Sequence, residues 1–223
     1  MEYILIRSKR KTVAIHVRDG VVEVRAPLNM LKCDIDDFVA SKERWIKEKL
    51  AVLRERFENR EAFTLNYGDI VTYRGKNYPV TAKKGNRVGF DDESFFIPPD
   101  LPAENVKSAC IQIYRMLARR DLTEKTVKYA KVMGIDPANV RVTNAKSRWG
   151  SCSAKKSINY SWRLIMADDD VVDYVVVHEL AHLYEMNHGE LFWARIESVM
   201  PDYRDRRLRL RELHRRIENE DWD

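Results

Sequence analysis

Hydrophobic and polar residues alternate along three short segments near the start of the chain: 3–7, 12–17 and 21–26. Alternation with a period of two is typical of half-buried strands. The Asp19-Gly20 pair between the second and third segments predicts a hairpin turn, and Pro27 closes the last strand. From Asp34 to about Phe57, apolar residues recur at spacings of three, four and seven, which predicts one helix.

Glycines punctuate a second strand-rich stretch, in which strands are predicted at 70–73, 78–82 and 94–97. A break at Pro98 and Pro99 then marks the predicted boundary between two regions of the chain. The first, 1–100, is rich in strands, and the second, 101–223, holds the candidate chemistry described below. The two regions can equally form one continuous domain.

The second region begins with a long helical pattern at 103–133, which Gly134 is well suited to end. Strands are predicted at 140–143 and 157–165, on either side of a loop at 148–152, and further helices close the chain. The whole pattern predicts a mixed α+β fold. Its strand-rich N-terminal part contains one helix, and its C-terminal part is mainly helical.

The composition is that of a globular protein that needs no disulfides. Of the 223 residues, 44% are hydrophobic and 34% are charged, so the chain can bury a core of its own. Its three cysteines are far apart and form no C-x-x-C pair, which favours a reducing, cytoplasmic location. No secretory signal is recognised at the N-terminus, and no segment approaches the ~18 apolar residues of a membrane-spanning helix.

The most specific motif follows the three aspartates at 168–170, which suit the N-terminus of a helix. The apolar residues after them predict that this helix is buried. Within it lies an HExxH motif formed by His178, Glu179 and His182. Two histidines four residues apart lie on one face of a helix, so both can bind one metal ion. Glu179 points about 100° away around the helix, where it can act as a general base on a water at the metal.

A catalytic zinc site needs a third protein ligand, and His188 is the best candidate. In a continuous helix His188 would point away from the metal. Its neighbours Asn187 and Gly189 both tolerate the left-handed conformation that ends a helix, so a turn can bring His188 back. The spacing matches that of the metzincins, although their glycine between the last two histidines is absent. Three other residues can replace His188 as ligand: Glu185, Glu190 and Glu197.

These residues predict a hydrolase with one zinc ion per chain. The histidines hold the metal, Glu179 takes a proton from the attacking water, and Arg148 is a candidate for stabilising a developing oxyanion. Arg148 belongs to the predicted loop, in which Trp149 and Cys152 are expected to pack against other residues. Gly150 is expected to form a turn or a bulge there.

The chain resembles the YgjP-like metallopeptidase family over nearly its whole length. Four segments carry the resemblance: R-W-G-S-C-S at 148–153, N-Y-S-W-R-L-I at 159–165, D-Y-V-V-V-H-E-L-A-H at 173–182 and N-H-G at 187–189. Gly189 departs from the family pattern, in which a serine is commoner. The resemblance implies a minimal zincin core with zinc on the three histidines, related to the SprT-like and Wss1-like proteases, and it does not define a substrate. The predicted hydrolytic chemistry itself suggests a peptide or protein substrate.

The last predicted helix, 203–217, holds seven arginines against two acidic residues. Such a helix is usually amphipathic with a solvated basic face. The alternative, together with a net charge of +5, is weak, non-specific binding of nucleic acid through Arg206, Arg207 and Arg211. The alternative function is therefore a nucleic-acid-associated module whose metal is structural. A closed structural site needs four protein ligands, and the sequence offers three convincing ones, which favours the enzyme.

Overall fold

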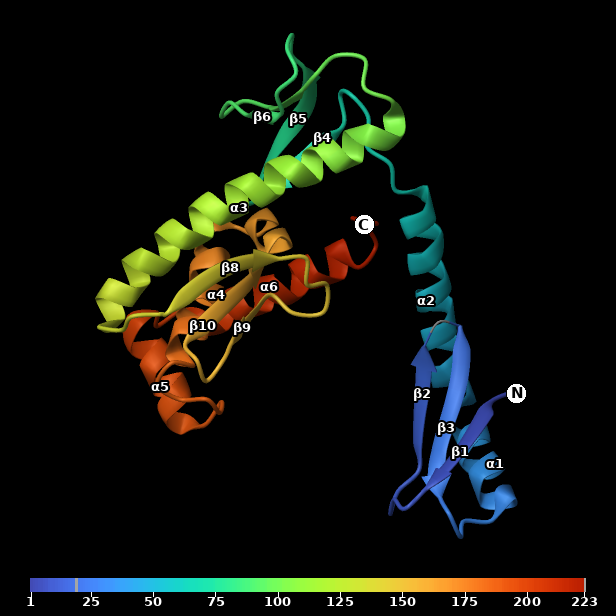
Figure 1. The fold of residues 1–223 in the computed structure, drawn as a ribbon. Helices are drawn as coiled ribbons and strands as arrows, with labels where there is room; N and C mark the ends of the chain where they lie inside the picture. Colours follow the sequence, from blue (N-terminus) through green and yellow to red (C-terminus); the bar gives the residue numbers. More distant parts are fainter. Residues whose placement is uncertain (19, 223) are drawn as a thin grey trace. The chain divides into compact units, whose positions relative to one another are not determined.

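The computed structural model describes residues 1–18 and 20–222 of the chain. The fold is mixed α+β, as the sequence predicts, and it comprises two compact units (Figure 1). The first unit consists of Met1–Phe63 and Glu218–Asp221, and the second consists of Thr64–Ile217 and Trp222. The boundary predicted from the prolines near residue 100 stays a prediction.

A three-stranded sheet and two helices form the first unit. Its elements are β1 (Ile4–Ser8), β2 (Ala14–Arg18), β3 (Val21–Pro27), α1 (Lys32–Ser41) and α2 (Glu43–Ala62). The central strand, β3, is antiparallel to β2 and parallel to β1. The hairpin turn predicted between β2 and β3 includes Asp19, which lies outside the described residues.

The prediction of one helix at 34–57 is wrong, because the structure contains two helices in this region. Lys42 separates them, with φ of −107° and ψ of 7°. Ile35 and Val39 of α1 and Ile46 of α2 are all buried in one core with β3. The apolar spacing therefore continues across Lys42, and a periodic pattern does not distinguish one helix from two that cover the same sheet.

Two sheets and a long helix form the framework of the second unit. The first sheet has the order β4-β5-β7-β6 and consists of β4 (Ile70–Tyr73), β5 (Lys76–Ala82), β6 (Gly89–Phe90) and β7 (Phe95–Ile97). Helix α3 (Ala103–Met133) contacts β7 of this sheet and β8 (Asn139–Thr143) of the second one (Figure 1). It ends at Gly134, whose φ of +68° is the left-handed conformation expected at a helix end.

The second sheet has the order β8-β10-β9, so β9 (Gly150–Cys152) is an edge strand. The central strand, β10 (Ser157–Ser161), is parallel to β8 and antiparallel to β9. The prediction of a loop throughout 148–152 is wrong for β9, because the pairing with β10 makes these residues extended. The strand predicted at 157–165 is too long, since the 3₁₀ helix η1 (Trp162–Met166) begins after Ser161.

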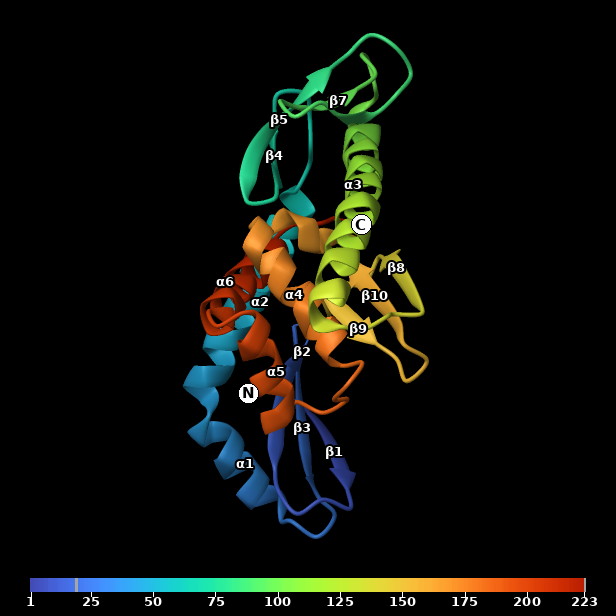
Figure 2. The same cartoon turned by 90° about the vertical axis from the view of Figure 1, so that its left-hand side faces the viewer.

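Three helices complete the second unit: α4 (Asp169–Ala181), α5 (Glu190–Val199) and α6 (Tyr203–Ile217). Figure 2 shows α4 between α3 and α6, and α4 contacts both of these helices as well as α5 and β9. Most residues of α4 are buried, as its apolar sequence predicts.

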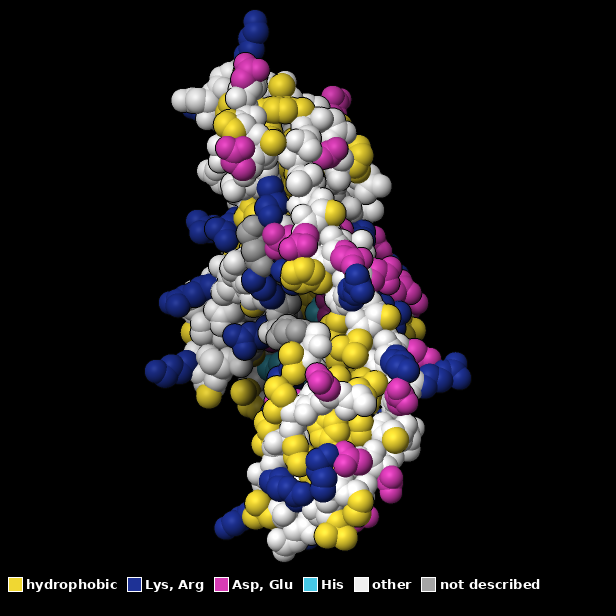
Figure 3. Space-filling model, turned by 90° about the vertical axis from the view of Figure 1, so that its right-hand side faces the viewer, with side chains coloured by type: hydrophobic (Ala, Val, Ile, Leu, Met, Phe, Trp, Pro, Cys, Tyr) yellow, Lys and Arg dark blue, Asp and Glu magenta, His cyan; other side chains and the backbone are white. Residues whose placement is uncertain are grey.

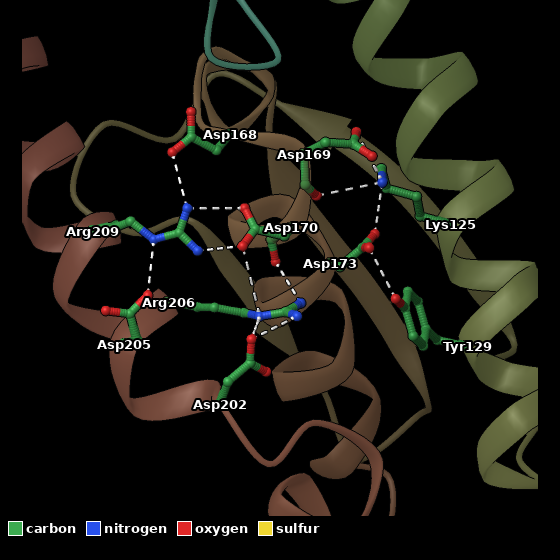
Figure 4. Close-up of polar contacts among 10 residues, drawn as sticks. All are labelled: Lys125, Tyr129, Asp168, Asp169, Asp170, Asp173, Asp202, Asp205, Arg206 and Arg209. Carbon is green, nitrogen blue, oxygen red and sulfur yellow. Dashed lines mark hydrogen bonds and ion pairs between the residues drawn. The ribbon is translucent and has the colours of Figure 1, made fainter.

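Charged residues fix the N-terminal half of α4 to the helices on both sides (Figure 4). Arg209 of α6 forms an ion pair with Asp170, and Arg206 Nη1 donates a hydrogen bond of 3.0 Å to the Asp170 carbonyl oxygen. On the other side, Lys125 of α3 binds the Asp173 carboxylate at 2.6 Å. These contacts hold in place the helix that carries the HExxH motif.

The surface carries both signs of charge. Figure 3 shows lysine and arginine side chains interspersed with aspartate and glutamate on the face that it draws, with hydrophobic side chains between them. Among the described helices, none combines the length and the apolar character that crossing a membrane requires.

Candidate metal centre

Helix α4 presents two of the predicted metal ligands from successive turns. His178 and His182 are separated by one helical turn, and their ring centroids are 4.9 Å apart. The last residue of α4 is Ala181, and His182 still has helical backbone angles, with φ of −64° and ψ of −15°. Both imidazoles therefore extend from the C-terminal end of a buried and well-anchored helix.

The chain turns after α4 and brings His188 back to the same place. His188 Nε2 lies 3.2 Å from His178 Nε2, and the candidate ligand atoms of the three histidines all lie within 4.8 Å of one another. The turn differs from the one expected, because Gly189 has φ of −77° and ψ of −173°. Asn187 also has no positive φ in the described chain. Hydrogen bonds from the amides of Tyr184 and Glu185 to the Ala181 carbonyl close the end of the helix instead.

A hydrogen bond orients the His182 ring, and a neighbouring tryptophan positions His188. His182 Nδ1 lies 3.1 Å from the carbonyl oxygen of Glu185, which favours a proton on Nδ1 and leaves Nε2 free as a metal ligand. Trp193 Nε1 donates a hydrogen bond of 3.0 Å to the His188 carbonyl, and the Trp193 and His188 rings are stacked with centroids 5.8 Å apart. The sequence alone does not reveal this role of Trp193, because a hydrogen bond to a backbone carbonyl leaves no mark in the spacing of residues.

This cluster fits a zinc ion. Two ligands on a tetrahedral zinc, each at about 2.0–2.1 Å, lie about 3.3 Å apart, which is close to the separation of the His178 and His188 nitrogens. Burial lowers the pKa of His178 to about 3, with smaller contributions from His182, His188 and Arg207. His178 is therefore neutral at pH 7, which is the form that binds metal.

The alternative carboxylate ligands lie outside this cluster of described residues. Glu185 contributes its backbone oxygen to the orientation of His182, and Glu197 forms an ion pair of 2.7 Å with Arg204. Glu190 is exposed at the first position of α5. The arrangement of the side chains thus favours His188 as the third ligand.

Glu179 is buried beside the histidines. Its side chain is only 5% exposed, and Oε2 has no hydrogen-bond partner among the described residues. Burial raises the pKa of Glu179 to about 8, whereas the positive charge of Arg148 lowers it. A carboxyl group with a pKa near neutrality can both accept and release a proton at physiological pH.

The edge strand β9 lies directly against Glu179. A Cβ atom added at Gly150 would stand 2.5 Å from Glu179 Oε1, so the lack of a side chain permits this close approach. The expectation that Gly150 forms a turn or bulge is wrong, because Gly150 pairs with Tyr160 in the regular register of β9 and β10. The sequence gives no sign of this contact, since the two residues are far apart along the chain.

The other residues of the predicted loop take different places. Arg148 is exposed just before β9, and its charge acts on Glu179. Trp149 is half-buried and contacts the ring of His214 in α6, with centroids 5.9 Å apart. Cys152 is half-buried in β9, and burial raises the pKa of its thiol. Packing of Trp149 and Cys152 therefore agrees with expectation.

The fold and this cluster define a protein with a candidate metal centre, built from an HExxH helix and the turn that follows it. The sequence model of the YgjP-like metallopeptidase domain matches residues 11–213, and the chain belongs to this family. Comparison with curated proteins found no match.

Two solved structures are similar to part of the chain. One is the metallopeptidase zymogen abylysin of Pyrococcus abyssi, with 22% identity and a TM-score of 0.38 over 40% of this chain and 90% of that one. The other is the metallopeptidase zymogen jannalysin of Methanocaldococcus jannaschii, with 18% identity and a TM-score of 0.38 over 41% of this chain and 94% of that one.

Proposed function

We propose that this metallopeptidase-family protein hydrolyses peptide bonds with one zinc ion per chain, held by His178, His182 and His188. The observation that carries the proposal is the approach of the three histidines to within 4.8 Å beside a buried glutamate. Three neutral imidazoles that leave one coordination position open are the ligand set of a catalytic zinc.

The residues around the metal position have complementary roles in this proposal. A bound zinc ion would act as a Lewis acid toward water and the scissile carbonyl. Glu179 accepts a proton from the attacking water and passes it to the leaving amine. Arg148 stabilises negative charge on the carbonyl oxygen as it develops.

The edge strand β9 is the proposed binding site for the peptide substrate. It pairs with β10 along one edge, so its other edge can accept an extended chain as an additional strand. Gly150 lies at the end of β9 and in contact distance of Glu179. A peptide bound along this strand would therefore have its backbone close to the general base.

Measurement of zinc and of hydrolysis on the same preparation tests the proposal. Wild-type protein should contain about one zinc per chain and cleave a denatured protein substrate. Glu179→Gln keeps the shape of the side chain without its basicity, so it should retain zinc and lose about 10²–10⁴-fold in hydrolysis. Equal hydrolysis by both proteins would exclude Glu179 as the base. Zinc without hydrolysis in either protein would favour the nucleic-acid-associated module with a structural metal.

A further inference from the structure

Helix α6 carries arginines on two flanks that have different surroundings. On one flank, Arg206 and Arg209 are bound to acidic residues at the start of α4 and within α6 (Figure 4). On the other flank, Arg207 and Arg211 are exposed and have no carboxylate partner among the described residues. The three arginines predicted to bind nucleic acid are thus not equivalent, because Arg206 already holds α4.

The flank of Arg207 and Arg211 faces the metal centre. The Arg207 guanidinium lies 5.0 Å from the centre of the Trp193 ring, which is stacked on His188. Stacking on an aromatic ring restricts the guanidinium, so Arg207 is held beside the metal ligands.

Arg211 lies one helical turn further along the same flank. A spacing of four residues places Arg211 on the same side of α6 as Arg207, whose guanidinium lies over the Trp193 ring.

The same flank continues toward the edge strand. His214, which follows Arg211 on this side of α6, contacts Trp149, and Trp149 directly precedes β9. One side of α6 thus extends from the histidine cluster to β9, the proposed binding site for the peptide. A substrate that occupies both β9 and the metal position would pass beside two exposed guanidinium groups.

We propose that Arg207 and Arg211 bind a carboxylate of the substrate, so that the enzyme prefers peptides with acidic residues beside the scissile bond. This inference rests on the proposed function. Two guanidinium groups next to a divalent cation repel one another and the metal, and an anion between them offsets this repulsion. The planar, forked donors of arginine match the two oxygens of a carboxylate.

A short anionic group fits this pair better than a nucleic acid does. Side chains four residues apart on a helix are about 6 Å apart, which suits one or two neighbouring carboxylates. A longer track of phosphates would also use the exposed arginines further along the helix, Arg215 and Arg216, whereas a carboxylate beside the scissile bond needs only the pair nearest Trp193 and the metal centre. The proposed hydrolysis at that centre therefore favours acidic peptide as the occupant.

Peptide binding to the zinc-loaded Glu179→Gln protein tests the inference without depending on turnover. The probes are a fluorescein-labelled, unstructured peptide that contains aspartate and glutamate and its asparagine and glutamine counterpart. The acidic peptide should bind about tenfold more tightly at low salt, and added salt should reduce the difference. Arg207→Gln combined with Arg211→Gln should abolish the preference. The matched control, Arg215→Gln with Arg216→Gln, changes the net charge equally at exposed positions of α6 and should preserve it.

Measurements of zinc content and thermal unfolding will establish whether each variant is intact. Arg211→Gln alone removes one of the two guanidinium groups and leaves Arg207 on the Trp193 ring, so it should reduce the preference for the acidic peptide. Equal affinity for both peptides, or a preference that survives the double variant, would overturn the inference. Binding of single-stranded DNA that depends on Arg207 and Arg211, without a preference among peptides, would also overturn it in favour of a nucleic-acid surface. A peptide preference without any hydrolysis by wild-type protein would support this inference and contradict the proposed function.

Discussion

Replacement of Gly150 by alanine is a direct perturbation of the contact between β9 and the proposed base. The added Cβ would stand 2.5 Å from Glu179 Oε1 and 2.6 Å from Cγ and Cδ. Ordinary van der Waals contact begins at 3.4 Å, so the two groups must separate by about 0.9 Å. Glu179 is 5% exposed and β9 is paired with β10, so neither side can yield freely.

Two effects of this change can be measured separately. A displacement of about 1 Å at a catalytic group costs on the order of 10²-fold in rate, so hydrolysis should fall by about this factor. Overpacking of a buried site typically lowers the free energy of unfolding by ~1–3 kcal/mol, which urea denaturation would detect. Zinc content should remain at the wild-type value, because the alanine methyl group is directed at Glu179 rather than at a histidine.

Gly189→Ala is the matched control for this substitution. A Cβ atom at Gly189 has nothing within 4 Å, and the φ of −77° at this position is ordinary for alanine. This variant is also close to the metal centre, yet it should keep both hydrolysis and zinc. Wild-type hydrolysis by Gly150→Ala would mean that the added methyl group does not displace Glu179. Loss of zinc from this variant would mean that the displacement extends to the histidines, and either result would refute the reasoning.

Three further predictions concern the metal, the support of α4 and the dependence on pH. His188→Ala should lose most of its zinc while Glu185→Gln keeps it, and the reverse result in a metal analysis would identify a different third ligand. Lys125→Met leaves the buried Asp173 carboxylate without its ammonium partner, so the free energy of unfolding in urea should fall by about 3–5 kcal/mol. In metal-free protein, the pKa of Glu179 is raised from 4.5 to about 8, so the folded state retains a proton that the unfolded state releases. Stability should therefore fall as pH rises from about 4.5 to 8, by up to ~4–5 kcal/mol, and Glu179→Gln should flatten this dependence in unfolding curves. A dependence unchanged in that variant would assign it to other groups.

The elements that could be predicted from the sequence are those with a regular pattern of their own. Alternation identifies the strands of the first unit, and the apolar residues around the HExxH motif identify α4 as a buried helix. The break at Lys42 was missed, because the apolar pattern on its two sides serves the same core. Strand β9 was missed for a different reason, since G-S-C has no alternation and becomes a strand by pairing with β10.

The sequence predicts which residues form the candidate site, but it does not predict the turn, the hydrogen bond and the packing contact that position them. Histidine spacing on a helix suffices to bring His178 and His182 together, because helical geometry is local. The return of His188 depends on a turn whose backbone differs from the one expected, and on the hydrogen bond from Trp193. The contact of Gly150 with Glu179 joins segments that are distant in the sequence, so only the folded structure reveals it.

The ion pairs of α4 offset the destabilising effect of unpaired polar atoms in the candidate metal centre. His178 Nδ1 and Glu179 Oε2 are buried without hydrogen-bond partners among the described residues, and each such atom costs on the order of 1–3 kcal/mol. Both belong to α4, so the helix that carries the candidate chemistry needs support elsewhere. The Lys125–Asp173 and Arg209–Asp170 pairs lie nearer its N-terminus, away from the histidines, and they hold the helix without occupying any metal ligand. Two groups of arginines on α6 can therefore be distinguished: Arg206 and Arg209 bind the start of α4 and stabilise the fold, and Arg207 and Arg211 lie on the flank that is proposed to bind the substrate.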